Sequence, residues 1–168
     1  MAASKQPGGH CRRHFDNFDQ LLAEVHALNA RPTRQLGNWS LGQICQHLGI
    51  AMHECVEGDK IFTAPLWLRI VGPWVRPRIL KRGLPRGFQI PRGGERLIPP
   101  PVAFEDGLAK LQGGLAALKS SQRRAAHPVF GRMNLAEWDQ FHLRHAELHL
   151  SFIVPVESEV PSAAAVAR

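Results

Sequence analysis

The sequence predicts an all-α fold, a four-helix bundle in which a long crossover rich in proline and arginine joins the second helix to the third. Three observations favour this fold. Apolar residues recur at helical spacing in four separate segments. Two of those segments begin with a capping-box pattern, Ser40 with Gln43 and Asn134 with Glu137. Residues 60–103, which lie between the second and third segments, are too dense in proline to continue a helix.

The first two helices are predicted on either side of a short turn. The first ends before Pro32, since proline cannot continue a helix. Its apolar stripe comprises Phe15, Phe18, Leu21, Leu22, Val25 and Leu28. The second begins after the Ser40 cap and runs to about Gly58. Its apolar face comprises Leu41, Ile44, Leu48, Ala51 and Cys55.

Residues 60–103 are predicted to form a long connection with one or two short helical turns, packed on the bundle. A connection of this length is uncommon inside a compact domain unless it is functional or crosses the fold. A four-helix bundle with a crossover needs one such connection. The apolar residues of this segment that require burial are Trp67, Leu68, Ile70, Val71, Trp74, Ile79 and Leu80.

The last two helices follow this connection. The third is predicted from leucines at helical spacing between Leu108 and Leu118, and the Gly113-Gly114 pair is expected to weaken it. The fourth begins after the Asn134 cap, runs to about Val154 and stops before Pro155.

Length and composition indicate one globular domain. The 168 residues are 44% hydrophobic and 21% charged, which suits a single packed core. We expect a disordered arm at residues 1–11, the bundle at residues 12–155 and a disordered tail at residues 156–168. The three cysteines form no C-x-x-C pair, and we interpret Cys45 and Cys55 as buried, inert thiols. Without a signal peptide or a long apolar stretch, the chain is expected to be cytoplasmic and to have no membrane span.

Histidines interrupt the apolar face of the predicted fourth helix. That face comprises Trp138, Phe141, His142, His145, Leu148, His149 and Phe152. Burying a polar group without a partner costs about 1–3 kcal/mol, so these imidazoles need partners. His145 and His149 are spaced i, i+4, which places them one turn apart, as two ligands of one metal ion require. Arg144 and Glu147 are predicted to face elsewhere.

A third ligand is expected from another helix, because two protein ligands would hold a metal weakly. His47, at the edge of the apolar face of the second helix, is the best candidate. His142, Gln43 and Glu54 are candidates for a fourth ligand or for side chains that orient the ligands. Glu54 lies on the same side of its helix as His47, but we interpret it as a solvated surface carboxylate.

Two other interpretations of the histidines are weighed. In a chain with nine histidines, one i, i+4 pair taken alone favours hydrogen-bonded core histidines over metal ligands. A metalloprotease is disfavoured, because the H-E-x-x-H motif needs a glutamate directly after the first histidine. Here Glu147 comes two residues after His145.

The chain nevertheless resembles a known family. Trp39-Ser40-x-x-Gln43-x-x-x-His47-Leu48, the arginine-rich middle and His142-Leu-Arg-His145-Ala-Glu-Leu-His149 resemble the DinB/YfiT-like superfamily. Gly37-Asn-Trp-Ser-Leu-Gly-Gln43 and Trp138-x-x-x-His142-x-x-His145 are most similar to an uncharacterised branch of it, a domain of unknown function. The similarity covers roughly residues 12–155.

That resemblance implies an up-down-down-up bundle and a divalent metal, usually zinc or nickel, held by His47, His145 and His149. Many relatives carry a histidine directly before the last ligand, where this chain has Leu148. Characterised relatives include transferases that join low-molecular-weight thiols to electrophiles, and thiol-dependent isomerases. We therefore expect a metal-dependent transferase or hydrolase-type enzyme acting on a small molecule, with a low-molecular-weight thiol as one candidate. A non-catalytic metal-binding or stress-associated module is the alternative.

The net charge of +7 and the pI of about 10.2 point to an anionic partner. Arg69 and Arg76 are candidates to hold the anionic groups of a substrate. Trp67, Trp74 and Phe88 among the arginines would also suit a nucleic-acid surface, but we expect only sequence-independent binding there. A homodimer is the other partnership considered.

Overall fold

The computed structural model of the chain describes residues 4–5, 9–58, 63–87 and 95–156, and these residues form a mostly helical fold. The helices are α1 (Phe18–Asn29), α2 (Leu41–Glu57), α3 (Leu66–Arg82), α4 (Phe104–Ser120) and α5 (Leu135–Leu150), with a 3-10 helix, η1, at Glu95–Leu97. The strands are β1 (Ser4–Lys5), β2 (Cys11–Arg12), β3 (Thr33–Gln35) and β4 (Ile153–Pro155). The strands make two small sheets, β1 with β2 and β3 with β4.

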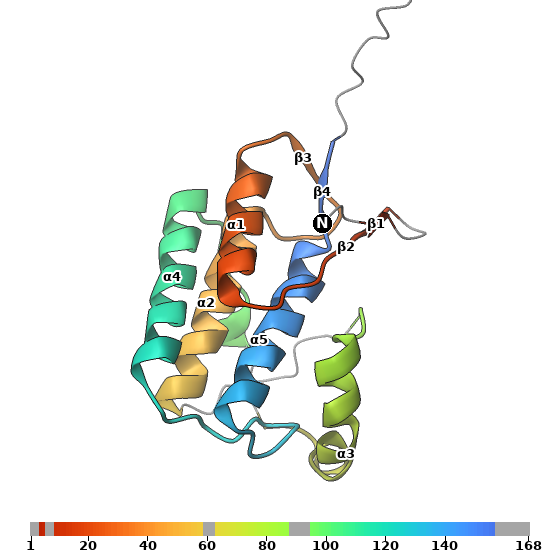
Figure 1. Ribbon diagram of the computed structural model, residues 1–168, viewed down its shortest axis with the longest axis vertical. Helices are drawn as coiled ribbons and strands as arrows, with labels where there is room; N and C mark the ends of the chain where they lie inside the picture. The colour runs from red at the N-terminus through yellow and green to blue at the C-terminus, as the bar shows by residue number, and fades with distance from the viewer. Residues whose placement is uncertain (1–3, 6–8, 59–62, 88–94, 157–168) are drawn as a thin grey trace, which may run out of the picture.

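Four of the helices, α1, α2, α4 and α5, lie alongside one another, and α3 lies to one side, beside α5 (Figure 1). The largest fully buried side chains include Leu21, Leu28, Ile44, Leu48, Met52, Leu111 and Leu150. These residues come from all four neighbouring helices, so one core serves the whole group. Among the residues that the structure describes, no helix is long and apolar enough to cross a membrane.

Both predicted capping boxes are present. The Ser40 hydroxyl accepts from the Gln43 amide at 3.2 Å, and the Gln43 side chain accepts from the Ser40 amide at 3.0 Å. Asn134 and Glu137 make the same pair of bonds at the start of α5. Each box satisfies two N–H groups that a helix start leaves without partners. The starts of α2 and α5, the helices that carry the candidate ligands, are therefore fixed locally.

Helices α2 and α4 approach so closely that glycines form their contact. A Cβ atom on Gly49 would stand 2.3 Å from the Lys110 carbonyl oxygen, and one on Gly107 would stand 2.1 Å from the Gly42 carbonyl oxygen. A Cβ on Gly114 would stand 2.7 Å from the Gly49 carbonyl oxygen. No side chain fits at these distances. Gly114, which was expected only to weaken its helix, is therefore required for the two backbones to touch.

The prediction of only short helical turns after α2 is wrong. Helix α3 is 17 residues long and contains Pro73 and Pro77. Both prolines are exposed, so the carbonyl groups that lose an N–H partner can bond to water. The helix changes direction along its length (Figure 1), as helices containing proline commonly do.

The expected burial of the apolar residues of α3 is also wrong for part of the helix. Leu80 is buried, and Leu68 and Ile79 are partly buried against the core. Trp67 and Trp74, by contrast, are 63% and 85% exposed. The reason is that α3 rests on its neighbours through one face only, so its other face points outward.

Helix α5 ends at Leu150 rather than near Val154, so its predicted end is wrong. Residues 153–155 form β4, which runs antiparallel to β3 with Arg34 opposite Val154. The Ser151 hydroxyl donates to a carbonyl of the last helical turn at 2.7 Å, and the β-branched residues that follow favour an extended strand. All of the predicted tail except its first residue lies outside the described residues.

The buried Arg13 holds the segment before α1 to the end of α5. Its guanidinium donates to the carbonyl oxygens of Leu150 and, at 2.8 Å, of Ile153. It also pairs with Glu24 of α1 at 2.7 Å. One cation therefore joins the start of the chain to α1 and to the turn between α5 and β4.

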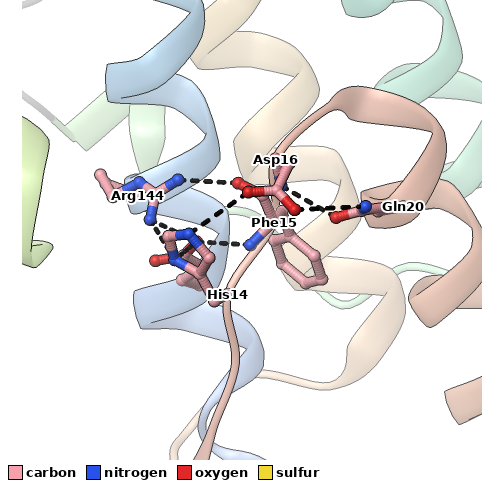
Figure 2. Close-up of polar contacts among 6 residues, drawn as sticks. His14, Phe15, Asp16, Gln20 and Arg144 are labelled. Atoms are coloured by element: carbon pink, nitrogen blue, oxygen red, sulfur yellow. Dashed lines mark hydrogen bonds and ion pairs between the residues drawn. The ribbon is translucent and has the colours of Figure 1, made fainter. Parts of the chain in front are cut away.

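A second buried arginine, Arg144, lies on α5 and contacts the same N-terminal segment. Figure 2 shows it beside His14 and Phe15. Arg144 donates to the Phe15 carbonyl at 2.7 Å and pairs with Glu147 at 2.9 Å. Glu147 in turn accepts from the Phe15 amide at 2.7 Å. The prediction that Arg144 and Glu147 face away from the packed side is therefore wrong, because the N-terminal segment covers that side of α5.

Candidate metal centre

Three histidines from two helices meet between α2 and α5. The Nε2 atom of His145 lies 3.1 Å from Nε2 of His47 and 2.9 Å from Nε2 of His149. One ligand nitrogen from each residue lies within 4.8 Å of the other two. Nitrogens that share a zinc ion at 2.0–2.1 Å stand roughly 3.3 Å apart. The spacing therefore suits one metal ion, and these are the three histidines chosen from the sequence.

The segment around η1 orients His47. The Nδ1 atom of His47 lies 2.6 Å from the carbonyl oxygen of Leu97. A carbonyl oxygen only accepts, so Nδ1 carries the proton and donates it, and Nε2 presents a lone pair to the other two histidines. Metal-binding histidines are commonly held in this way. Sequence reasoning missed this partner because a backbone carbonyl leaves no residue-type signal.

Neutral imidazoles cannot satisfy all of these contacts by themselves. Since Nε2 of His47 has no proton, the proton between His47 and His145 must come from His145. That nitrogen of His145 then cannot accept from His149, so either one N–H faces two lone pairs or two N–H groups face each other. A cation at the meeting point of three lone pairs interacts favourably with all of them. The donor set therefore fits a divalent ion.

Aromatic rings enclose the three imidazoles. Trp39 stacks on His149, with ring centroids 5.3 Å apart and planes 17° apart, and lies tilted against His47 at 4.8 Å. Phe141 stacks on His145 at 5.8 Å and 23°. These contacts restrict rotation of the imidazoles. Trp39 belongs to the motif that carried the family resemblance, and that motif could have marked it as a residue of the site. No role was assigned to it from the sequence.

Burial keeps the three histidines neutral. It lowers the pKa of His47 to about 4, although the bond to Leu97 acts in the opposite direction. Burial, followed by the charge of His47, lowers the pKa of His149 to about 3. Burial, then His149 and His47, lowers the pKa of His145 well below its usual value. Neutral imidazole is the form that binds metal, and His145 and His149 are only half-buried, so the group is not sealed inside the core.

His142 is not brought to the ligand nitrogens. Its Nε2 atom lies 3.3 Å from the Cys55 sulfur, and its ring stacks on Trp138 at 5.4 Å and 25°. Burial, followed by the charges of His127 and Arg124, lowers its pKa to about 3. The structure thus gives this histidine a partner in the core, while the group of candidate ligands within the described residues consists of the other three.

The two remaining candidates beside the ligands have different surroundings. The Gln43 side chain donates to the Pro99 carbonyl at 3.0 Å, so it ties the start of α2 to the segment that also supplies Leu97. Glu54 is only 7% exposed, so its interpretation as a solvated surface carboxylate is wrong. The fold covers this side of α2, which is also the side that carries His47.

Of the two arginines proposed to hold a substrate, Arg76 is bound to residues near the start of α5. Arg76 pairs with Glu137 at 3.3 Å and donates to the Arg132 carbonyl. Glu137 lies two turns before His145, roughly 12 Å along the helix axis. Arg76 therefore fastens α3 to the start of α5, and Arg69 is exposed on α3.

Cys45 and Cys55 are buried, as predicted, and Cys11, for which burial was not predicted, is buried as well. All three are free, and burial raises the pKa of both Cys45 and Cys55 to about 12. A thiol held in its protonated form is a poor nucleophile. Neither residue is therefore a candidate for covalent chemistry.

His127 is a structural histidine whose role sequence reasoning missed. Its Nδ1 atom accepts from the amides of Val129 and Phe130, both at 3.1 Å, in the loop before α5. Burial lowers its pKa to about 3. A lone histidine in a loop has no spacing pattern, so the sequence carried no signal for this role.

Fold and site together define the class: a mostly helical protein in which histidines from two helices could hold a metal ion. The chain belongs to the family described as Protein of unknown function (DUF1569), whose family model matches residues 11–156. The match extends from β2 to the end of β4, and so includes all three histidines. No curated protein and no solved structure matches the chain.

Proposed function

We propose that this chain binds one divalent metal ion through His47, His145 and His149 and acts as a metal-dependent enzyme on a small molecule. The observation that carries the proposal is the convergence of three imidazole nitrogens within 4.8 Å. The proton of His47 is directed away from them, toward Leu97. Zinc and nickel are the ions proposed, because both suit imidazole ligands.

The proposed architecture is the DinB/YfiT-like four-helix bundle, made of α1, α2, α4 and α5 in an up-down-down-up course. Support comes from the side-by-side arrangement of these helices in Figure 1. It also comes from the long connection between α2 and α4, which contains α3. In that superfamily the ligands come from the second and last helices of the bundle, as they would here.

The ligand set supports the reaction class that the superfamily resemblance suggested. Three neutral ligands leave a bound ion its full charge, which favours a thiolate over a thiol and a hydroxide over water. The chain holds the imidazoles in place through Trp39, Phe141 and the Leu97 carbonyl. His142 faces Cys55 and does not compete for the site. We therefore propose a transferase or hydrolase-type activity, with a low-molecular-weight thiol as the candidate substrate.

A non-catalytic metal-binding module is the second candidate. The observation that favours it is the close approach of Nε2 of His145 to Nε2 of both His47 and His149, since a metal would satisfy that polar cluster whether or not chemistry follows. The two candidates differ in one respect: only an enzyme needs the ion to accept a small ligand.

The first experiment measures metal content. The purified protein is expected to hold about one zinc or nickel ion per chain, and the His145→Ala/His149→Ala variant is expected to lose it. His53→Ala is the matched control, because His53 lies on the same helix as His47 but its side chain is 45% exposed and pairs with Glu57. Full occupancy in the double variant would show that the ligand assignment is wrong.

The second experiment separates enzyme from module. A small thiol is expected to change the visible absorption of the cobalt-substituted protein through sulfur–metal ligation. His47→Ala should abolish the change, whereas Cys45→Ala should not, because Cys45 is buried and is not a proposed ligand. If the cobalt protein forms but no thiol, water or hydroxide exchange is detected, the non-catalytic candidate is correct.

A further inference from the structure

Helix α3 carries an apolar face that nothing in the described structure covers. Trp74 is 85% exposed, and Leu66, Trp67 and Ile70 are each more than 60% exposed. Val71 and Val75 extend the same face. Elsewhere among the described residues, Ile98 and Val156 are the large hydrophobic residues with comparable exposure, and they are far apart in sequence. Exposed apolar residues gathered on one helix mark an interaction site rather than ordinary surface.

The opposite face of α3 explains why the helix stays in place without burying these residues. A Cβ atom on Gly72 would stand 2.0 Å from the Val129 carbonyl oxygen, so the helix backbone rests directly on the loop before α5. Arg76 is anchored to Glu137 at 3.3 Å. Leu80 is buried in the core. The outer apolar face is thus presented by a helix that is fixed from behind.

The same helix is strongly cationic. Residues 63–87 contain no Asp or Glu. Apart from the anchored Arg76, their cations are the exposed Arg69, Arg78, Lys81, Arg82 and Arg86. Most of these follow the apolar residues along the helix, so the outer side is apolar in its first turns and positively charged in its last.

Positive charge continues beyond the end of α3. A cavity of about 340 Å³ lies where the helix end meets α5, and its charged lining consists of Arg12, Arg13, Arg82, Arg86, Arg144 and Glu147. Arg13 already donates to the Ile153 carbonyl, and Arg144 and Glu147 are already engaged with Phe15 of the N-terminal segment. Arg12 and Arg82 are exposed beside them, so the cationic region is broader than the helix itself.

We propose that the outer face of α3 docks on the surface of an anionic lipid membrane. Tryptophan and aliphatic side chains partition into the boundary between headgroups and acyl chains, and arginine and lysine bind lipid phosphates. A segment that lies in this boundary does not need the length of a membrane span, and on α3 the apolar and cationic regions follow one another along the helix rather than lying on opposite faces. Both regions are present on α3.

Two other partners fit these observations less well. A second copy of the chain would bring identical surfaces together, so the α3 cations of one copy would meet those of the other without any acidic residue from residues 63–87 to pair with them. Nucleic acid would satisfy the cations but would leave the aliphatic residues Leu66, Ile70 and Val71 exposed to water. An anionic bilayer accommodates both kinds of side chain.

The test is co-sedimentation of the full chain with vesicles of phosphatidylcholine alone or mixed with phosphatidylglycerol. We expect binding to the anionic vesicles, a blue shift of tryptophan emission on binding, and loss of binding at about 1 M salt, where the Debye length falls to about 3 Å. Each cation near an anionic surface contributes about a fivefold increase in affinity. Arg78→Glu/Lys81→Glu should therefore weaken binding at least tenfold.

Two further variants separate the contributions. Trp67→Ser/Trp74→Ser should weaken binding at least tenfold and remove most of the blue shift, because these side chains supply the apolar contact. Lys110→Glu/Lys119→Glu is the matched control: it changes the net charge by the same amount on α4, whose two lysines are exposed. The control should bind as the native chain does. All substituted side chains are exposed, so thermal unfolding midpoints should stay unchanged.

Three outcomes would overturn the proposal. The first is no binding to anionic vesicles at low salt. The second is equal weakening by the α3 and α4 charge variants, which would indicate a non-specific effect of net charge. The third is a stable dimer in solution that Trp67→Ser/Trp74→Ser dissociates, which would identify a second copy as the occupant. None of these measurements depends on the metal centre.

Discussion

The Nδ1 atom of His47 lies 2.6 Å from the carbonyl oxygen of Leu97, and this bond joins α2 to the 3-10 turn η1. It connects the candidate metal centre to the segment that precedes α4. The Gln43 side chain, which donates to the Pro99 carbonyl at 3.0 Å, is a second link between the same two parts.

The first prediction follows from this bond. Adding zinc to the metal-free protein should slow hydrogen exchange at the Ile98 amide, which bonds to the Glu95 carbonyl at 2.9 Å. The reason is that the ring of a metal-bound His47 cannot rotate, so its hydrogen bond to the Leu97 carbonyl opens less often. Exchange at residues 121–126, a loop between α4 and α5, is the control and should change little. Equal slowing in both segments would point to general stabilisation instead.

The second prediction concerns the glycine contact between α2 and α4. Gly49→Ala should lower the free energy of unfolding by about 2–3 kcal/mol, because its Cβ would meet the backbone of Lys110 and force the helices apart. Gly113→Ala is the matched control. A Cβ there has no atom within 4 Å, so removing a helical glycine should stabilise the protein by about 0.5–1 kcal/mol. Urea unfolding measures both, and effects of the same sign would contradict the close contact.

The third prediction concerns Arg13. Arg13→Ala should cost about 3 kcal/mol of stability, because it leaves the Leu150 and Ile153 carbonyls and the Glu24 carboxylate without their buried partner. Arg12→Ala, at the exposed neighbouring position, should change stability by less than about 0.5 kcal/mol. Similar losses from the two variants in thermal and urea unfolding would show that the bonds of Arg13 contribute little.

The fourth prediction is a pH dependence of stability that depends on His127. Burial lowers its pKa to about 3 in the folded chain, from a usual value of 6.5. Between these values the unfolded chain binds a proton that the folded chain does not, so stability falls as pH falls from 6.5 toward 3. The loss attributable to this histidine should be roughly 1.4 kcal/mol per pH unit.

His127→Asn tests that assignment, because an asparagine oxygen can accept from the same loop amides but does not titrate. Urea unfolding at several pH values should show a slope smaller by about one proton in this variant. Gln122→Asn, at an exposed position that does not titrate, is the control and should leave the slope as it is in the native chain. An unchanged slope in His127→Asn would mean that other groups, such as His142, account for the acid sensitivity.

Local patterns predicted the helices that carry the site. The first residues of α2 and α5 were predicted correctly. The capping bonds that fix them, of Ser40 with Gln43 and of Asn134 with Glu137, form within one helical turn. The spacing of His145 and His149 was informative for the same reason: an i, i+4 pair on a helix has one geometry whatever surrounds it.

The sequence predicted less well those features that depend on which other segments cover a helix, such as the burial of its polar side chains. Proline density suggested that α3 could not form, but Pro73 and Pro77 lie on an exposed side where water can replace the missing partners. Arg144 was placed off the apolar face of its helix, but the N-terminal segment covers it there and supplies the Phe15 carbonyl. Glu54 was misplaced for a similar reason.

By itself, the sequence determined the helical class, the boundaries set by caps and the identity of three histidines able to meet, because these depend on residue type and on contacts within a few residues. Only the tertiary structure decided that His142 turns to Cys55, that Leu97 orients His47, and that α3 keeps its apolar face outward. Those outcomes depend on which distant backbone happens to lie beside each side chain. Backbone carbonyls and amides are alike at every position, so no pattern of residue types records where they will be needed.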